Sequence, residues 1–130
     1  MIPTSKGAAR AVGLVLPELD GKLDGVALHV PAPNVSCVDF TFETTRATNP
    51  KEINDAMQAA SENHLKGILG ITDEKLVSMD FNHDSHPSIF SADQTRVISG
   101  TFCRVLAWYD NEWRFSNRML DTATEMAKYY

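Results

Sequence analysis

The stretch from Trp108 to Arg118 constrains the fold of this chain more than any other. It is dense in aromatic and charged side chains, and the periodicity of the sequence changes within it. Before it, side chains alternate between two faces, which is typical of a strand; after it, apolar side chains recur at helical spacing to the end of the chain. A strand is therefore followed directly by a helix. Asp110 or Asn111 is expected to cap that helix, because their side-chain oxygens accept hydrogen bonds from its first free N–H groups.

Length and composition fit one domain. The chain has 130 residues, of which 43% are hydrophobic and 22% charged, enough to bury one core. Its formal net charge of −5 argues against a general affinity for nucleic acid or anionic membranes. No apolar run approaches the roughly 20 residues that span a bilayer, and the N-terminus lacks the features of a signal peptide. The two cysteines have no metal or disulfide spacing and suit a reducing compartment, so we expect a cytoplasmic protein.

The first part of the chain predicts a helix and a strand. Thr4 or Ser5 can cap a helix that continues to Val15. Pro17 is expected to end it, because the residue before a proline is pushed out of helical geometry. Residues 26–30 then alternate as a strand that the following prolines break.

The remaining elements predict an α+β fold. Residues 35–43 alternate as a strand, with Val38, Phe40 and Phe42 on its core face. A capping asparagine, a proline and a glutamate open a helix at Asn49–Glu52. Further elements follow by the same patterns: strands at 67–72 and 76–79, a polar turn at 82–87, antiparallel strands at 94–99 and 101–109, and the C-terminal helix. Few crossover helices separate these strands, which favours a mostly antiparallel or mixed sheet with helices packed on one face.

Five separated stretches, in the same order, resemble one enzyme family. They are residues 3–19, 30–36, 65–69, 80–84 and 108–118. Together they resemble the C-terminal catalytic domain of phosphorylating glyceraldehyde-3-phosphate dehydrogenases, and they cover most of residues 1–130. Residues 82–84, 94–97 and 118–122 also resemble the related erythrose-4-phosphate dehydrogenases. The choice between a triose and a tetrose phosphate substrate, and between NAD and NADP, stays open.

The resemblance implies an oxidoreductase of carbohydrate metabolism (glycolysis in the first branch) whose cysteine attacks an aldehyde, with hydride passing to NAD and the acyl group to phosphate. These 130 residues hold neither the family's Cys-Thr-Thr-Asn-Cys segment, nor its base histidine, nor its Rossmann domain. Covalent catalysis requires both the nucleophile and the base. We therefore expect a partial domain without dehydrogenase activity of its own. The alternative is a non-catalytic oligomerisation or binding module derived from that domain.

A phosphate-binding turn is implied at Ser5, Lys6 and Gly7. The N–H groups of a helix's first turn favour a bound anion, although an ordinary capped helix with an exposed lysine has the same sequence pattern. Lys6 stands where the family usually has threonine. His29 stands where the family usually has a phosphate-gripping arginine, and a histidine is mostly neutral at pH 7 and offers one donor. We expect either weak, acid-favoured binding of phosphate or a sugar phosphate, or no binding.

Asn111 matches a family asparagine that contacts the nicotinamide end of NAD, a role compatible with its place at the helix start. Arg114 replaces a usual glycine and is expected to intrude there. The resemblance further implies assembly as a homo-oligomer, or with a full-length relative. In the family the last helix packs on the cofactor domain, so here it is expected either to repack or to expose an apolar stripe.

Two other groups are interpreted as structural. His83-Asp84-Ser85-His86 brings two histidines and a carboxylate together, but a metal site needs three or four converging ligands, so we interpret it as a polar surface turn. Cys37 and Cys103 each lie mid-strand among apolar residues, where a small buried hydrophobe is the expected role. No catalytic or metal-binding residue is therefore assigned.

Overall fold

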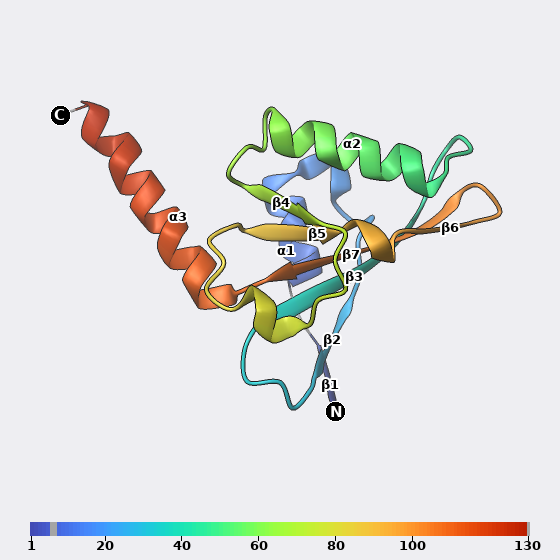
Figure 1. Ribbon diagram of the computed structural model, residues 1–130, viewed down its shortest axis with the longest axis horizontal. Coiled ribbons are helices and arrows are strands. Elements are labelled where there is room, and N and C mark those ends of the chain that lie inside the picture. The colour runs from blue at the N-terminus through green and yellow to red at the C-terminus, as the bar shows by residue number, and fades with distance from the viewer. Residues whose placement is uncertain (6–7, 130) are drawn as a thin grey trace. The chain divides into compact units, whose positions relative to one another are not determined.

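The computed structural model describes residues 1–5 and 8–129. The chain divides into two compact units, Met1–Pro33 and Asn34–Tyr130. Figure 1 shows the elements of both units in chain order by colour.

The first unit is a two-stranded antiparallel ladder with a short helix. Its elements are β1 (Ile2–Ser5), α1 (Ala8–Val15), the 3-10 turn η1 (Pro17–Leu19) and β2 (Val26–His29). The helix ends before Pro17, as predicted, and Leu16 has left helical geometry with φ −122° and ψ 83°. The prediction that Thr4 or Ser5 caps the helix is wrong, because both residues pair with β2 inside β1.

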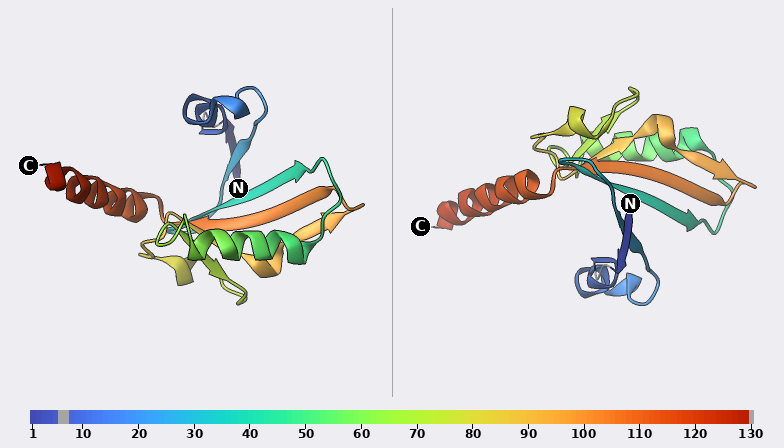
Figure 2. Two further views of the ribbon diagram at one scale, coloured as in Figure 1. Left: turned by 90° about the horizontal axis from the view of Figure 1, so that it is seen from above. Right: turned by 90° about the horizontal axis from the view of Figure 1, so that it is seen from below.

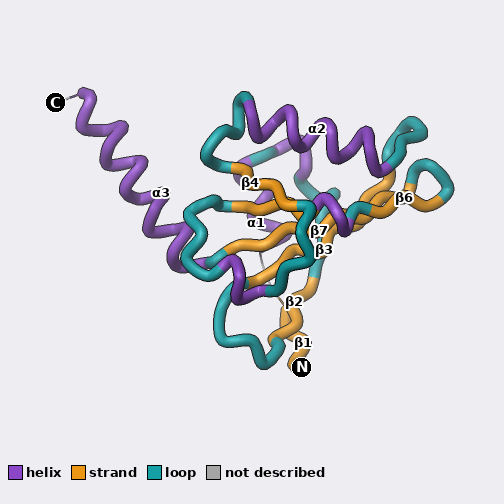
Figure 3. The backbone as a smooth tube through the Cα atoms, in the orientation of Figure 1, coloured by secondary structure: helices purple, strands orange, loops and turns teal. Residues whose placement is uncertain are grey.

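The second unit is a mixed sheet with helices. Its elements are β3 (Ser36–Glu43), α2 (Pro50–Glu62), β4 (Leu69–Thr72), the 3-10 turn η2 (Ser78–Phe81), β5 (Ser88–Ser91), the 3-10 turn η3 (Ala92–Gln94), β6 (Arg96–Ile98), β7 (Phe102–Tyr109), α3 (Asn111–Met126) and the 3-10 turn η4 (Ala127–Tyr129). The strand order is β3-β7-β5-β4, with β6 also paired to β7 (Figure 3). Only β4 and β5 run parallel; the other pairs are antiparallel. The predicted α+β class is confirmed.

In this unit one local prediction fails and one strand was not predicted. The strand expected at 76–79 is wrong, since the 3-10 turn η2 begins there at Ser78. Strand β5 was not expected, because its sequence, Ser-Ile-Phe-Ser, has no polar-apolar alternation and follows a polar turn. It is nevertheless central, lying between β4 and β7. Tertiary pairing rather than local pattern defines it.

The turn between β6 and β7 agrees with its sequence. Ser99 and Gly100 have φ angles of 52° and 78°, so both lie in the left-handed region. Residues 99–101 connect the two strands, and a short connection containing glycine with positive φ is common in antiparallel hairpins. The predicted hairpin is confirmed, with its register fixed at Ile98 opposite Phe102.

The core of the second unit lies on its central strands. Phe90 of β5 and Cys103 of β7 are its fully buried side chains, and they are joined by four further buried apolar residues: Leu69, Phe81, Ile89 and Leu106. Val38 and Phe40 are exposed, so their assignment to a core face is wrong. Strand β3 is an edge strand, and α2 lies over β4 at the other end of the sheet (Figure 2).

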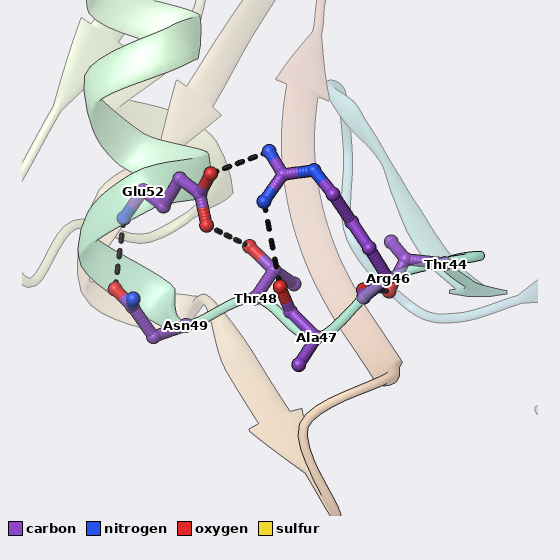
Figure 4. A network of polar contacts seen from close by, with 6 residues as sticks. All are labelled: Thr44, Arg46, Ala47, Thr48, Asn49 and Glu52. Atoms are coloured by element: carbon purple, nitrogen blue, oxygen red, sulfur yellow. Dashed lines mark hydrogen bonds and ion pairs between the residues drawn. The ribbon is translucent and has the colours of Figure 1, made fainter.

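Helix α2 begins as the sequence predicts. Asn49 caps it by accepting a hydrogen bond from the Glu52 backbone N–H at 3.0 Å, and Pro50 holds the first helical position. The Glu52 carboxylate accepts from Thr48 at 2.8 Å and from Arg46 at 2.5 Å (Figure 4). These side-chain partners all lie within six residues of one another, and the Thr48 backbone N–H donates to the Gly100 carbonyl oxygen at 2.7 Å. The side-chain network of the helix start is therefore local.

Helix α3 leaves the end of β7 and extends away from the sheet (Figures 1 and 2). Of the two outcomes expected for it, the exposed apolar stripe is the one observed. Its large apolar side chains are exposed: Trp113, Phe115, Met119, Leu120 and Met126. Within the described residues, no helix combines the length and apolar character needed to cross a bilayer.

Candidate functional site at the start of α3

The junction between β7 and α3 is built around a buried carboxylate. Asp110 caps α3 and is only 2% exposed. Its Oδ1 accepts a hydrogen bond from the Trp113 backbone N–H at 3.2 Å. Its Oδ2 accepts two more, from the His83 backbone N–H and from Asn34 Nδ2, both at 3.0 Å. Of the two capping residues that the sequence left open, the structure selects Asp110.

These donors come from three parts of the second unit. Asn34 precedes β3 and also donates from Nδ2 to Asn82 Oδ1 at 2.6 Å. His83 follows η2 and has φ 63°, a left-handed conformation that is uncommon for a residue with a side chain. Its ring lies 4.6 Å from the Trp113 ring, centroid to centroid, with 31° between their planes. Asp110 therefore connects two loops to the first turn of α3.

The surroundings of Asp110 favour its ionised form. Burial alone raises the pKa of a carboxyl group, since it penalises the charge. Here the hydrogen bonds from the His83 and Trp113 backbones and from the Asn34 side chain outweigh that penalty. They hold the pKa of Asp110 below its ordinary value.

Asn111, the expected nicotinamide contact, occupies the first helical position and is exposed. Among the residues that the structure describes, its carboxamide makes no hydrogen bond to another side chain. The carboxamide therefore keeps two donors and an acceptor for a ligand such as a nicotinamide amide. Asp110, its neighbour, supplies the cap, so Asn111 is not needed for that task.

Arg114 contacts the protein instead of projecting freely. Its Nη1 donates to the Pro87 carbonyl oxygen at 3.1 Å, and its guanidinium carbon lies 4.9 Å from the centre of the Tyr109 ring. This is cation–π geometry on a partly buried ring. The side chain thus joins α3 to the segment before β5 and to the end of β7.

The residues expected to bind phosphate belong to the first unit. Lys6 and Gly7 lie outside the described residues, as does the side chain of Ser5. The backbone register pairs Ser5 with Val26 and Ile2 with His29. Ser5 and His29 therefore stand at opposite ends of the β1–β2 ladder, about 10 Å apart along the strands at the usual rise per residue. The ladder does not place them side by side.

The segment from His83 to His86 is a turn with both local and long-range contacts. The Asp84 carboxylate accepts from the His86 backbone N–H at 2.8 Å and lies 2.7 Å from His86 Nδ1. The His83 ring instead faces Trp113. No group of three or more metal-ligating side chains converges anywhere in the described part of the chain.

The two cysteines differ in burial. Cys103 is fully buried and its thiol lies 3.4 Å from the Thr101 carbonyl oxygen, as expected for a small core residue. Cys37 is exposed on the edge strand, so the prediction that it is buried is wrong. Partial burial and the nearby Asp39 carboxylate raise the pKa of the Cys37 thiol. A nucleophilic thiol needs the opposite shift.

Sequence reasoning missed Asn34 and His83 as parts of this site. Each lies far from Asp110 along the chain, by 76 and 27 residues. The available signal was the resemblance itself, since both residues fall inside matched stretches. Periodicity gave no sign of either, because both residues lie in loops.

Comparison with known proteins gives consistent matches. Residues 1–111 match the family model of the glyceraldehyde 3-phosphate dehydrogenase C-terminal domain. The chain is 62% identical over 128 residues to glyceraldehyde-3-phosphate dehydrogenase of Xanthobacter flavus and 61% identical over 128 residues to that of Cereibacter sphaeroides. Each alignment covers 98% of this chain and 38% of the relative. The enzyme of Zymomonas mobilis is 58% identical over 129 residues.

These matches span both units and include Asn34, Asp110 and Asn111. The chain covers less than half the length of the relatives that it matches. The family is NAD-dependent and its members form homo-oligomers. The polypeptide belongs to the glyceraldehyde-3-phosphate dehydrogenase family, in which it represents the C-terminal domain.

Proposed function

We propose that this chain forms the C-terminal part of the catalytic domain of an NAD-dependent phosphorylating dehydrogenase, acting on glyceraldehyde 3-phosphate and inactive by itself. The proposal rests on sequence identity. Over nearly the whole chain, about three residues in five are identical to those of enzymes named glyceraldehyde-3-phosphate dehydrogenase. The relatives' names favour the triose over the tetrose phosphate. The unpaired state of both cysteines fits a reducing compartment, the cytoplasm.

Asn111 is the proposed cofactor contact. It is exposed at the first position of α3, next to a cap that is itself buried and fully bonded. A carboxamide offers both donor and acceptor to the amide of the nicotinamide ring. Its proposed role is to fix the orientation of that ring while hydride is transferred, a positioning effect rather than proton transfer.

Ser5, Lys6, Gly7 and His29 are the proposed phosphate contacts. They occupy the positions of a family phosphate-binding turn and its partner strand. Because Ser5 and His29 are separated along the ladder, His29 is proposed as an outer contact that strengthens on protonation. Phosphate affinity, measured by isothermal titration, should fall from pH 5.5 to 8. An affinity that is flat over this range would remove His29 from the proposal.

Complementation tests the function. The chain would be co-expressed with the segment of the Xanthobacter flavus enzyme that it does not cover, and NAD reduction would be followed with glyceraldehyde 3-phosphate and phosphate. We expect no activity from either part alone and activity from the mixture, reduced by Asn111→Ala. A co-purifying but inactive mixture would count against the dehydrogenase role, provided that the intact relative is active under the same conditions.

A second candidate function, a non-catalytic oligomerisation module, is favoured by the exposed apolar surface of the second unit. Val38 and Phe40 on the edge strand, and Phe115 and Leu120 on α3, are all exposed. Surfaces of this kind mark protein contacts. Light scattering after gel filtration, with and without a full-length relative, separates the cases. Mixed oligomers, together with no activity in the complementation assay, would support this function, and a lone monomer would argue against it.

A further inference from the structure

Helix α3 is attached to the second unit through its first turn. Among the described residues, the side-chain hydrogen bonds and ring contacts that join it to the rest of this unit involve its cap Asp110, Trp113 and Arg114. Beyond that turn the apolar side chains are exposed, and the helix extends away from the sheet (Figure 2). A helix held at one end takes its direction from that end. In the 130-residue chain, the contacts of the first turn therefore decide where α3 points.

The two oxygens of Asp110 have separate tasks within that turn. Oδ1 satisfies the Trp113 N–H, which is ordinary helix capping. Oδ2 accepts from Asn34 and from the His83 backbone, neither of which belongs to the helix. The second oxygen is thus a tether between α3 and two loops. An ionised acceptor makes each of these bonds stronger than a neutral one would be.

The tether also fixes the residue beside it. Asn111 follows Asp110 directly, and its backbone is the first of the helix. Among the described residues, no side-chain hydrogen bond holds its exposed carboxamide in place. The direction in which it presents its donor and acceptor therefore depends on the orientation of the first turn.

We propose that Asp110, together with Asn34, is a positioning residue that orients α3 and thereby presents Asn111 to the nicotinamide ring. The cofactor half of this proposal rests on the function proposed above. The orientation half rests on the contacts of the second unit alone. Capping by itself requires only Oδ1. The two long-range hydrogen bonds to Oδ2 have no capping role, and orienting α3 gives them one.

Two variants separate the tether from the cap. Asp110→Ser keeps a side-chain oxygen for the Trp113 N–H but loses the second acceptor. Asn34→Ala leaves the cap intact and removes one donor to the tether. Asn49→Ala, at the cap of α2, is the matched control, since the Asn49 side chain accepts its hydrogen bond from the backbone only three residues on.

The first measurement is the orientation of α3 in the 130-residue chain, by backbone N–H residual dipolar couplings. In the wild type, couplings of α3 should fit the same alignment tensor as those of β3 and β7. In both tether variants they should fall toward zero while those of the strands persist. Couplings of α3 that still fit the shared tensor in both variants would overturn the proposal. The control should leave α3 unchanged.

The second measurement is the KM for NAD in the complemented enzyme. Each tether variant should raise it about tenfold, the usual scale for losing a hydrogen bond to a charged group, with a smaller effect on kcat. An unchanged KM despite a reoriented α3 would overturn the positioning of Asn111 and leave the proposed function standing. An inactive wild-type mixture would count against the function, and the couplings alone would then decide the orientation of α3.

Discussion

Helices α2 and α3 begin with the same kind of signal but are held by different means. Asn49 and Asp110 each accept a hydrogen bond from the backbone three residues on. The partners around Asn49 lie within a few residues of it and are largely exposed. Asp110 is buried and has partners 27 and 76 residues away. The same local pattern can therefore place the capping side chain in a local network or at a junction between distant segments.

The energetic consequence follows from burial. Exposed polar groups that lose a partner bond to water, so their loss is small. Buried donors that lose an acceptor are left unsatisfied, and each costs on the order of 1–3 kcal/mol. We expect the two helix starts to respond very differently to equivalent substitutions.

The largest effect is expected for Asp110→Ala. It removes the cap and leaves the Asn34, His83 and Trp113 donors without their acceptor, so the free energy of unfolding should fall by about 3 kcal/mol. Urea denaturation followed by tryptophan fluorescence measures this change. Glu112→Ala, an exposed acidic residue in the same turn, is the control. Equal losses in the two variants would mean that the long-range bonds contribute nothing.

Acid should remove part of the same contribution. Because hydrogen bonds hold the pKa of Asp110 below its unfolded value of about 3.9, its ionised form stabilises the fold at pH values above that value. The stabilisation is lost as pH falls through the lower, folded-state pKa. Unfolding free energies measured from pH 6 to 2 should decline less steeply for Asp110→Asn than for the wild type. Parallel curves would contradict this assignment.

A smaller effect is expected at the start of α2. Asn49→Ala removes a local cap, which typically costs about 1 kcal/mol. Asn49→Asp should restore most of it, because aspartate caps equally well. The urea midpoint of the two variants provides the test. A loss as large as that of Asp110→Ala would show that the comparison between the two helix starts is wrong.

The smallest effect is expected for Arg46→Ala. The ion pair of Arg46 with Glu52 is exposed, and exposed pairs of this kind contribute little. We expect no measurable shift of the urea midpoint at either low or high salt. A clear, salt-dependent shift would mean that the polar network before α2 is more than a local surface feature.

Much of the second unit could be predicted because its signals are local. Alternation defined β3 and β7, the Asn49-Pro50 pair defined the start of α2, and Ser99-Gly100 defined a hairpin. Strand β5 escaped prediction because a four-residue strand is defined by its two neighbours. The exposure of Val38 and Phe40 was also not predicted. Alternation shows which side chains share a face of the strand, but it does not show whether another element covers that face.

The same division applies to the candidate site. Sequence alone determined the family, the junction between strand and helix, and Asn111 as the residue to examine, because these depend on residues close together in the chain. Only the tertiary structure decided that Asp110 is the cap, that it is buried, and that Asn34 and His83 donate to it. The contacts of Arg114 with Pro87 and Tyr109 were likewise decided by the tertiary structure. Hydrogen bonds between distant segments have no period along the chain, so only folding brings their donors and acceptors together.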